Sequence, residues 1–286
     1  NVDIVAEDDA EALAKARELI SVLPSNNENT GVICECDDDL NRITAGLGTH
    51  VKDTAVALRE ISDNNWFLEL KADCAKEMVI GFIRLNGAIV GAVANRSEIL
   101  GEDGKAAKKF DSVLTMAGAY KAAHFVNFCD SFSIPVLTLT SVTGFASSVG
   151  EERSIARALS QLTAAFANAT VPKVNLIVGK AYGSAYITMN SKHIGADLVF
   201  AYSDAEIGMM DAKLAAEIIY DGKDAATISE KAGEYAALQN NPVAAAKRGF
   251  VDSIIEPAAT RKQLVYAFEM LYTKREFRPN KKHSTI

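Results

Sequence analysis

The stretch Val171–Asn190, VPKVNLIVGKAYGSAYITMN, changes character twice within twenty residues. A β-branched run at Val174–Val178 predicts a buried strand, and Gly183 then begins a segment that predicts a helix. Small residues between the two let another molecule approach the backbone closely. The first amides of a helix have no intrahelical partner and lie at the positive end of its dipole. We therefore predict that this turn can receive an oxyanion, and it is the best candidate for chemistry in the chain.

The segments around this stretch predict an α/β protein. Alternating strands and helices with short connections favour mainly parallel strands with the helices packed outside. In such folds the ligand usually lies beyond the carboxyl ends of the strands, where we expect the turns at Gly144-Phe145 and Gly183–Ala185. The further strands are expected at 134–139 and 196–202, and the helices at 111–128, 151–168, 212–219, 225–238, 243–248 and 260–271.

The first hundred or so residues predict a lead helix followed by the start of the sheet. Asp53 is expected to cap a helix that ends at Ile61. Asn86-Gly87, between two apolar runs, is the strongest hairpin signal in the chain, because both residues tolerate positive φ. The other expected segments are an amphipathic helix at 8–23, a polar linker at 25–30, a polar surface segment at 37–47 and a polar connection at 101–109.

The composition indicates a folded, cytoplasmic protein. The net charge of −7 and pI near 5.3 argue against nucleic acid as a partner. No apolar run reaches the ~18 residues of a membrane span, so we expect no membrane insertion. The four cysteines suggest reduced structural thiols, and the histidines match no metal-ligand spacing, so we expect no metal. Asn1 in place of Met leads us to expect a fragment or a processed chain.

Five long blocks resemble, in order, the C-terminal half of the carboxyltransferase subunits of biotin-dependent acyl-CoA carboxylases and decarboxylases. The resemblance implies a crotonase-like fold, a spiral of β-β-α units with outer helices. It also implies a crotonase-like domain at 71–286, with residues 1–70 as a helical lead and linker that packs on it. The blocks are GFIRLNGAIVGAVANR, KAAHFVNFCDSFSIPVLTL, FANATVPKVNLIVGKAYGSAYITM, SKHIGADLVFAYSDAEIGMM and KRGFVDSIIEPAATRKQL.

The same resemblance implies a function and a site. The chain would transfer a carboxyl group between biotin on a carrier protein and a coenzyme A thioester, with biotin itself taking the acyl-CoA α-proton. The amides of Ser184 and Ala185 would form the biotin-side oxyanion hole. The implied partners are a biotin carboxyl carrier protein, an N-terminal carboxyltransferase domain or subunit, and further copies of the chain. The residues expected to border biotin or the acyl group are Gly144, Phe145, Tyr182, Gly183, Tyr186 and Ile187.

Departures from the family pattern cluster around this pocket and keep alternatives open. Ser184 replaces a glycine, Ser141–Phe145 reads SVTGF in place of Asp-Val-Pro-Gly-Phe, and Ile187 stands where propionyl-CoA carboxylases have Asp. A non-catalytic assembly module is the alternative function. A free-standing hydratase or thioesterase is weaker, because it needs its own coenzyme A site and a general base.

Four side chains in or near the turn have an alternative role. Ser184 as a nucleophile lacks the Gly-x-Ser-x-Gly setting and a histidine placed to activate it, so we favour its amide. Lys180 is expected at the end of the strand, either solvated or against a phosphate or carboxylate. For Glu206 and Asp204 we favour a structural hydrogen bond over an acid–base pair.

Overall fold

An eight-stranded sheet is the centre of the protein, in a computed structural model that describes residues 2–26, 29, 31–101 and 103–276. The strand order is β1-β2-β3-β7-β9-β10-β12, with β11 beside β9. The pairings β3·β7, β7·β9, β9·β10, β9·β11 and β10·β12 are parallel, which confirms the predicted α/β class. The strands are β1 (Phe67–Leu70), β2 (Met78–Leu85), β3 (Ala88–Asn95), β7 (Val136–Val142), β9 (Lys173–Tyr182), β10 (Leu198–Tyr202), β11 (Glu206–Gly208) and β12 (Ser253–Ile255).

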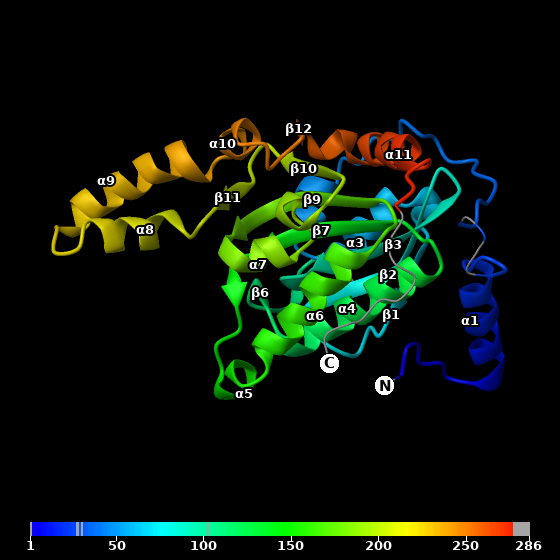
Figure 1. Cartoon of the computed structure of the whole chain (residues 1–286). Helices are drawn as coiled ribbons and strands as arrows, with labels where there is room; N and C mark the ends of the chain where they lie inside the picture. Colours follow the sequence, from blue (N-terminus) through cyan, green and yellow to red (C-terminus); the bar gives the residue numbers. More distant parts are fainter. Residues whose placement is uncertain (1, 27–28, 30, 102, 277–286) are drawn as a thin grey trace.

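Both faces of the sheet are covered, so two apolar clusters form the core. Helices α4 (Met116–Ser131) and α6 (Ile155–Asn168) pack on one face, and α3 (Thr54–Ile61) and α11 (Thr260–Leu271) pack on the other (Figure 1). Neighbouring residues of one strand therefore enter different clusters, as Val79 and Ile80 do. This two-sided burial explains why the strands are continuous apolar runs rather than alternating ones.

The predicted hairpin at Asn86-Gly87 is confirmed. Both residues have positive φ, 51° and 76°, and join β2 to β3. A Cβ added at Gly87 would lie 1.9 Å from the Cys34 carbonyl oxygen, so the second position requires glycine. The carboxylate of Asp63 accepts hydrogen bonds from both amides of the turn, at 3.1 and 2.7 Å. Asp63 thereby fixes the turn to the segment after α3.

A buried arginine in the last helix pairs with two carboxylates from the first quarter of the chain. Arg261 of α11 is fully buried, and its Nη2 lies 2.7 Å from Asp63 Oδ1 and 3.4 Å from Asp38 Oδ2. Its Nη1 donates to the carbonyl of Ile61 at 2.9 Å. The expectation that 37–47 is a surface segment is therefore wrong for Asp38, because this carboxylate is a buried partner of the arginine.

The helices expected at 212–219 and 260–271 have the predicted bounds, and most of the others are present with different bounds. The lead helix α1 (Asp9–Ser21) has Asp8 as its N-cap, and Asp53 caps α3 as predicted. The segment expected at 111–128 begins only at Met116, since the Thr115 side chain accepts a hydrogen bond from Gly118 N. The other elements are α2 (Leu47–His50), η1 (Asp63–Asn65), α5 (Val149–Glu152), α7 (Gly183–Thr188), η2 (Lys192–Ile194), α10 (Pro242–Lys247) and η4 (Pro257–Ala259).

Two expected segments differ in kind. The helix expected at 151–168 is two helices, α5 and α6. The polar connection at 101–109 contains β5 (Ala106–Lys109), which pairs with β4 (Glu98–Leu100) as a separate ribbon. Residues 27, 28 and 30 of the linker expected at 25–30 lie outside the described residues.

The division of the chain into a lead at 1–70 and a domain at 71–286 remains a proposal. Strand β1, just before residue 71, pairs with β2, just after it.

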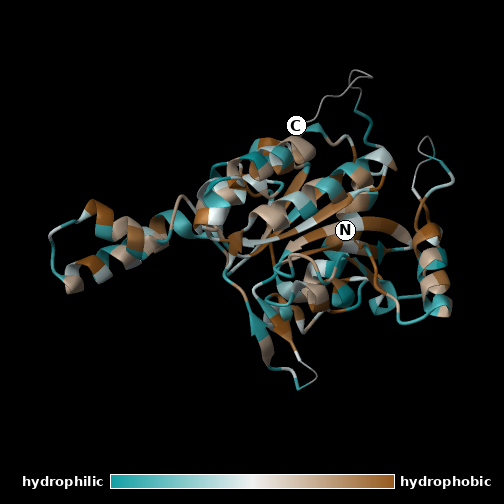
Figure 2. Ribbon diagram, turned by 90° about the horizontal axis from the view of Figure 1, so that it is seen from below, coloured by the Kyte–Doolittle hydropathy of each residue, from teal (hydrophilic) through white to brown (hydrophobic). Residues whose placement is uncertain are grey.

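Two helices form an arm that projects from the sheet (Figure 1). The arm leaves β11 as α8 (Ala212–Ile219) and returns as α9 (Ala225–Tyr235), followed by a π-helical turn, η3 (Ala236–Asn240). Hydrophobic residues occur along both helices (Figure 2). Ile218 and Ile219 are 62% and 60% exposed, so much of the apolar surface of the arm is not covered within the described chain.

Lys121 of α4 gives a pH-dependent prediction. Its Nζ is buried and donates to the carbonyls of Lys71 and Cys74, each at 2.8 Å. Burial lowers the pKa of Lys121 from 10.5 to about 8. Between these two pH values the unfolded chain binds more protons than the folded one, so this lysine makes the free energy of unfolding rise with pH.

We expect the unfolding free energy of the parent minus that of Lys121→Met to rise between about pH 8 and 10.5, by up to about 1.4 kcal/mol per pH unit. Urea denaturation of both proteins across this range measures it. Because all other groups titrate in both proteins, their contributions to the unfolding free energy cancel in the difference. A difference that is constant with pH would contradict the lowered pKa.

Among the described residues, no helix combines the length and apolar character needed to cross a membrane.

Candidate active site

The central strand and helix meet at Gly183, as the sequence predicts. Strand β9 ends at Tyr182, and α7 begins at Gly183, which has a φ of +55° and no side-chain cap before it. A Cβ added at Gly183 would lie 3.0 Å from the Met209 carbonyl oxygen, so both the backbone angle and the close contact favour glycine. The amides of Ser184 and Ala185, in the first turn of α7, have no partner within the helix.

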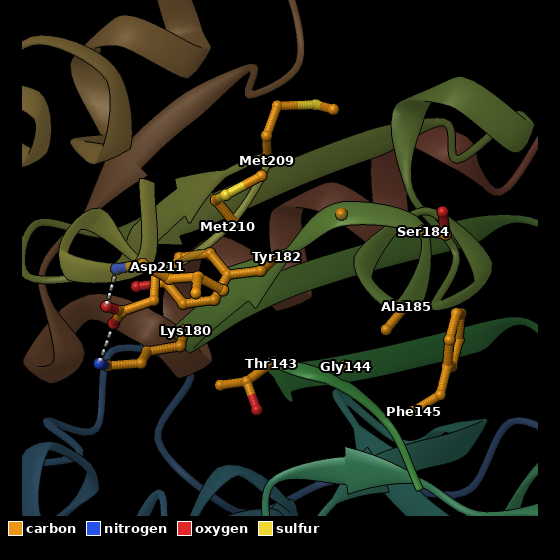
Figure 3. Close-up of a pocket in the computed structure, with 12 residues that line it drawn as sticks. Thr143, Gly144, Phe145, Lys180, Tyr182, Ser184, Ala185, Met209, Met210 and Asp211 are labelled. Carbon is orange, nitrogen blue, oxygen red and sulfur yellow. Dashed lines mark hydrogen bonds and ion pairs between the residues drawn. The ribbon is translucent and has the colours of Figure 1, made fainter. Parts of the chain in front are cut away.

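The segment Gly144-Phe145 lies beside the turn at Gly183, but the expectation of a turn there is wrong. Strand β7 runs parallel to β9 and ends at Val142, and Gly144-Phe145 follow as the short strand β8 because they pair with β6 (Val113–Leu114). The turn at Gly183 and β8 line one cavity of about 420 Å³. Figure 3 shows the Ala185 side chain directed toward the side of Gly144 and Phe145, whereas the Ser184 hydroxyl points away. This orientation favours the amide of Ser184 over its hydroxyl as the functional group.

A third segment, Met209–Asp211, forms the opposite wall of the cavity. It follows β11, whose parallel pairing with β9 places Gly208 opposite Tyr182. This wall was not predicted, because no motif singles out its residues. The nearest feature that the sequence predicts is the strand at 196–202, several residues before the wall.

Lys180 connects the wall to β9. The β7·β9 register shifts between Thr140 and Val142, and such a bulge re-aims nearby side chains. The Lys180 Nζ lies 3.5 Å from Asp211 Oδ2 and 3.8 Å from Glu206 Oε2 (Figure 3 shows the first pair). The expectation that Lys180 ends the strand is wrong, because β9 continues to Tyr182.

The Tyr182 hydroxyl is a hydrogen-bond donor at the base of the wall. It lines the cavity and donates to Glu206 Oε2, which confirms a structural hydrogen bond for Glu206. Burial, followed by the hydrogen bond to Glu206, raises the pKa of Tyr182 far above its ordinary value, so the phenol keeps its proton. Asp204 is exposed and does not line the cavity.

Two of the predicted site residues lie elsewhere. Tyr186 is buried in the core, with its ring edge-on to His193 at 6.0 Å between centroids. Burial raises the pKa of Tyr186 to about 12. Neither Tyr186 nor Ile187, which follow the turn on α7, lines this cavity. The predicted residues that do line it are Gly144, Phe145, Tyr182, Gly183, Ser184 and Ala185.

The chemistry available in the cavity is hydrogen-bond donation. In the described part of the chain, no group of three or more His, Cys, Asp or Glu side chains is arranged to hold a metal ion. Lys180 is paired with two carboxylates, and Tyr182 keeps its proton. The groups that remain to receive a developing negative charge are the backbone amides at the start of α7.

Comparison with known proteins gives one consistent result. The carboxyl transferase domain family matches residues 1–286. A propionyl-CoA carboxylase beta chain of Roseobacter denitrificans is 39% identical over 294 residues, which cover 99% of this chain and 56% of that protein. The methylmalonyl-CoA carboxyltransferase 12S subunit of Propionibacterium freudenreichii subsp. shermanii is 38% identical over 300 residues, covering 100% of this chain and 55% of that protein. The chain therefore spans about half the length of the relatives that it matches.

A solved structure of transcarboxylase 12S, described as a hexamer with hydrolysed methylmalonyl-coenzyme A bound, superimposes with a TM-score of 0.89 at 38% identity. The match covers 99% of this chain and 55% of that one. The beta subunit of a Pseudomonas aeruginosa geranyl-CoA carboxylase shares the fold at 23% identity, with a TM-score of 0.67. These matches confirm the predicted crotonase-like fold.

Proposed function

Because the chain belongs to the carboxyl transferase domain family, we propose that it forms the biotin-side half of an acyl-CoA carboxyltransferase or decarboxylase. The observation that carries the proposal is that the turn at Gly183 and the short strand β8 line one cavity. The unpartnered amides of Ser184 and Ala185 start α7 beside Gly144-Phe145. In the proposed function these amides are the oxyanion hole, and one such donor is typically worth about 3 kcal/mol of transition-state stabilisation.

The residues present fit a biotin ring. A Cβ added at Gly144 would meet nothing within 4 Å, and the cavity of about 420 Å³ is of the size of small-ligand pockets. When bound on a carrier protein, biotin would supply the transferable carboxyl group. Ser184 and Ala185 would donate hydrogen bonds to it, Phe145 would pack against it, and Tyr182 would border it from the opposite side. Lys180 is held by Asp211 and Glu206, so we assign it to the structure of the wall.

The substrate and the partners are part of the same proposal. The relatives are named for propionyl-CoA and methylmalonyl-CoA, so we propose a coenzyme A thioester as the substrate. Since the chain spans about half of these relatives, an N-terminal carboxyltransferase domain or subunit would supply the acyl-CoA side. A biotin carboxyl carrier protein would deliver biotin. The exposed apolar side chains of α8 support a homo-oligomer, and a cytoplasmic location agrees with the free cysteines.

The assembly-module alternative is less well supported. A drifted pocket would tend to be filled by side chains or to lose its tight turn. Here Gly183 keeps its positive φ and its close contact with Met209, and the cavity is open.

Binding of biocytin, which is biotin joined to lysine, tests the proposal by calorimetry. We expect the parent chain to bind it and Ser184→Ala to bind it equally well, since the hydroxyl points away from the cavity and the amide is unchanged. Loss of binding in Ser184→Ala would contradict the assignment to the amide. No binding by the parent at millimolar biocytin would contradict a preformed biotin site.

A further inference from the structure

We propose that Asn240, which does not line the cavity, positions the wall Met209–Asp211 against the turn at Gly183. Asn240 lies about 55 residues after that turn in the sequence, yet its side chain reaches the back of the wall. The consequence for biotin rests on the proposed function, whereas the positioning of the wall does not. Asn240 is thus a positioning residue rather than one that touches the ligand.

The side chain of Asn240 points inward from the end of the arm. The residue ends the π-helical turn η3 and is 1% exposed, although Leu238, two residues earlier, is 69% exposed. Its Nδ2 donates to the carbonyl of Met210 at 3.0 Å. A π-helical turn inserts an extra residue into a helix and is often found at functional sites. Here the turn directs a polar side chain toward the wall instead of toward solvent.

Strand β11 leaves room for this side chain. A Cβ added at Gly208 would lie only 2.2 Å from Asn240 Oδ1, far closer than any real contact. Gly208 therefore has a specific steric role, because any larger residue would displace the amide of Asn240. The same amide contributes a hydrogen bond near Tyr182, which partly offsets the rise in the pKa of that phenol. Asn240 thus contacts two parts of the wall region at once.

Each residue of the wall has its own attachment. Met209 places its carbonyl against Gly183, Met210 accepts from Asn240, and Asp211 pairs with Lys180 at 3.5 Å. The attachment of Met209 is contact alone. Asp211 forms a half-exposed ion pair, which contributes little, and its carboxylate accepts hydrogen bonds from the amides of Lys213 and Leu214 just after it. The part-buried hydrogen bond from Asn240 is therefore the side-chain restraint that joins the wall to the end of the arm.

The first test uses a signal from the wall itself. In protein labelled with ¹³C-methyl methionine, only six methyl signals are expected. Asn240→Ala removes the donor to Met210, so we expect the Met209 and Met210 signals to shift or broaden while the other four stay in place. Biocytin affinity is expected to fall about tenfold as the wall moves. Leu238→Ala, an exposed site on the same turn, is the control and should change neither measurement.

A second variant separates the hydrogen bond from packing. In Gly208→Ala/Asn240→Ala, the new methyl group occupies space that the amide leaves, so thermal stability should recover relative to Asn240→Ala. The Met210 signal and biocytin affinity should not recover, because the donor is still missing. Recovery of both, or an unchanged Met210 signal in Asn240→Ala, would overturn the proposal. If the Met210 signal shifts in Asn240→Ala but the parent chain binds no biocytin, the result would support the role of Asn240 and contradict the biotin site.

Discussion

Replacing Arg261 by methionine is expected to lower the free energy of unfolding by about 3–5 kcal/mol, the largest stability effect that we predict. Arg261 is fully buried beside the carboxylates of Asp63 and Asp38. Methionine fills much of the same volume but leaves the Asp63 charge without its cation. Breaking one side of a buried ion pair is costly because the remaining charge is desolvated and uncompensated.

Urea denaturation with two reference variants measures this effect. Lys262→Met, the exposed neighbour on α11, makes the same substitution at a site without the ion pair and should change stability by less than about 0.5 kcal/mol. Asp63→Asn together with Arg261→Met should cost less than the sum of the two single changes, since neither charge is then left alone. An Arg261→Met protein as stable as Lys262→Met would show that the pair contributes nothing.

Gly183→Val is expected to weaken biocytin binding by about tenfold to a hundredfold, the equivalent of losing two amide hydrogen bonds. Gly183 has a φ of +55°, which a β-branched residue adopts only with strain, and its Cβ would lie 3.0 Å from the Met209 carbonyl oxygen. The turn must therefore change, and the amides of Ser184 and Ala185 change direction with it. Calorimetry with biocytin measures the loss.

Gly222→Val is the matched control for this substitution. Gly222 also has a positive φ, of +79°, but it lies between α8 and α9 with nothing within 4 Å of an added Cβ. The backbone strain is comparable and the cavity is remote, so stability should fall and biocytin binding should not. Equal binding by Gly183→Val and the parent would place the biotin site elsewhere.

Local sequence signals predicted much of the fold because they act over a few residues. Asn86-Gly87 identified its hairpin, and Asp53 identified the start of α3. The errors arise where distant contacts decide the outcome. Asp38 looks like part of a surface segment until Arg261, more than 200 residues later, makes it a buried partner. Lys180 looks like a strand end until β11 pairs with β9 and extends the strand to Tyr182.

In the candidate site, too, local signals predicted some residues, and distant contacts decided the others. Gly183 was identified because a tight turn with positive φ requires a small residue, and Gly144 because Gly144-Phe145 resembles the family pattern, although it lies in β8 rather than in a turn. Tyr186 and Ile187 follow directly in sequence but do not line the cavity, and Tyr186 is buried in the core. Met210 and Asn240 carry no local signal, because their relation depends on a helical turn that returns from the arm to β11. Only the three-dimensional arrangement reveals the wall.

The pairing of Arg261 with Asp63 also bears on how the protein is made. A ribosome releases Asp63 and the hairpin that it supports long before Arg261 is synthesised, since 198 positions separate the two residues. During that interval the nascent chain holds an aspartate without its cation, so the sheet cannot reach its final stability. Residues that join late to early segments in this way delay completion of the fold until α11 has left the ribosome.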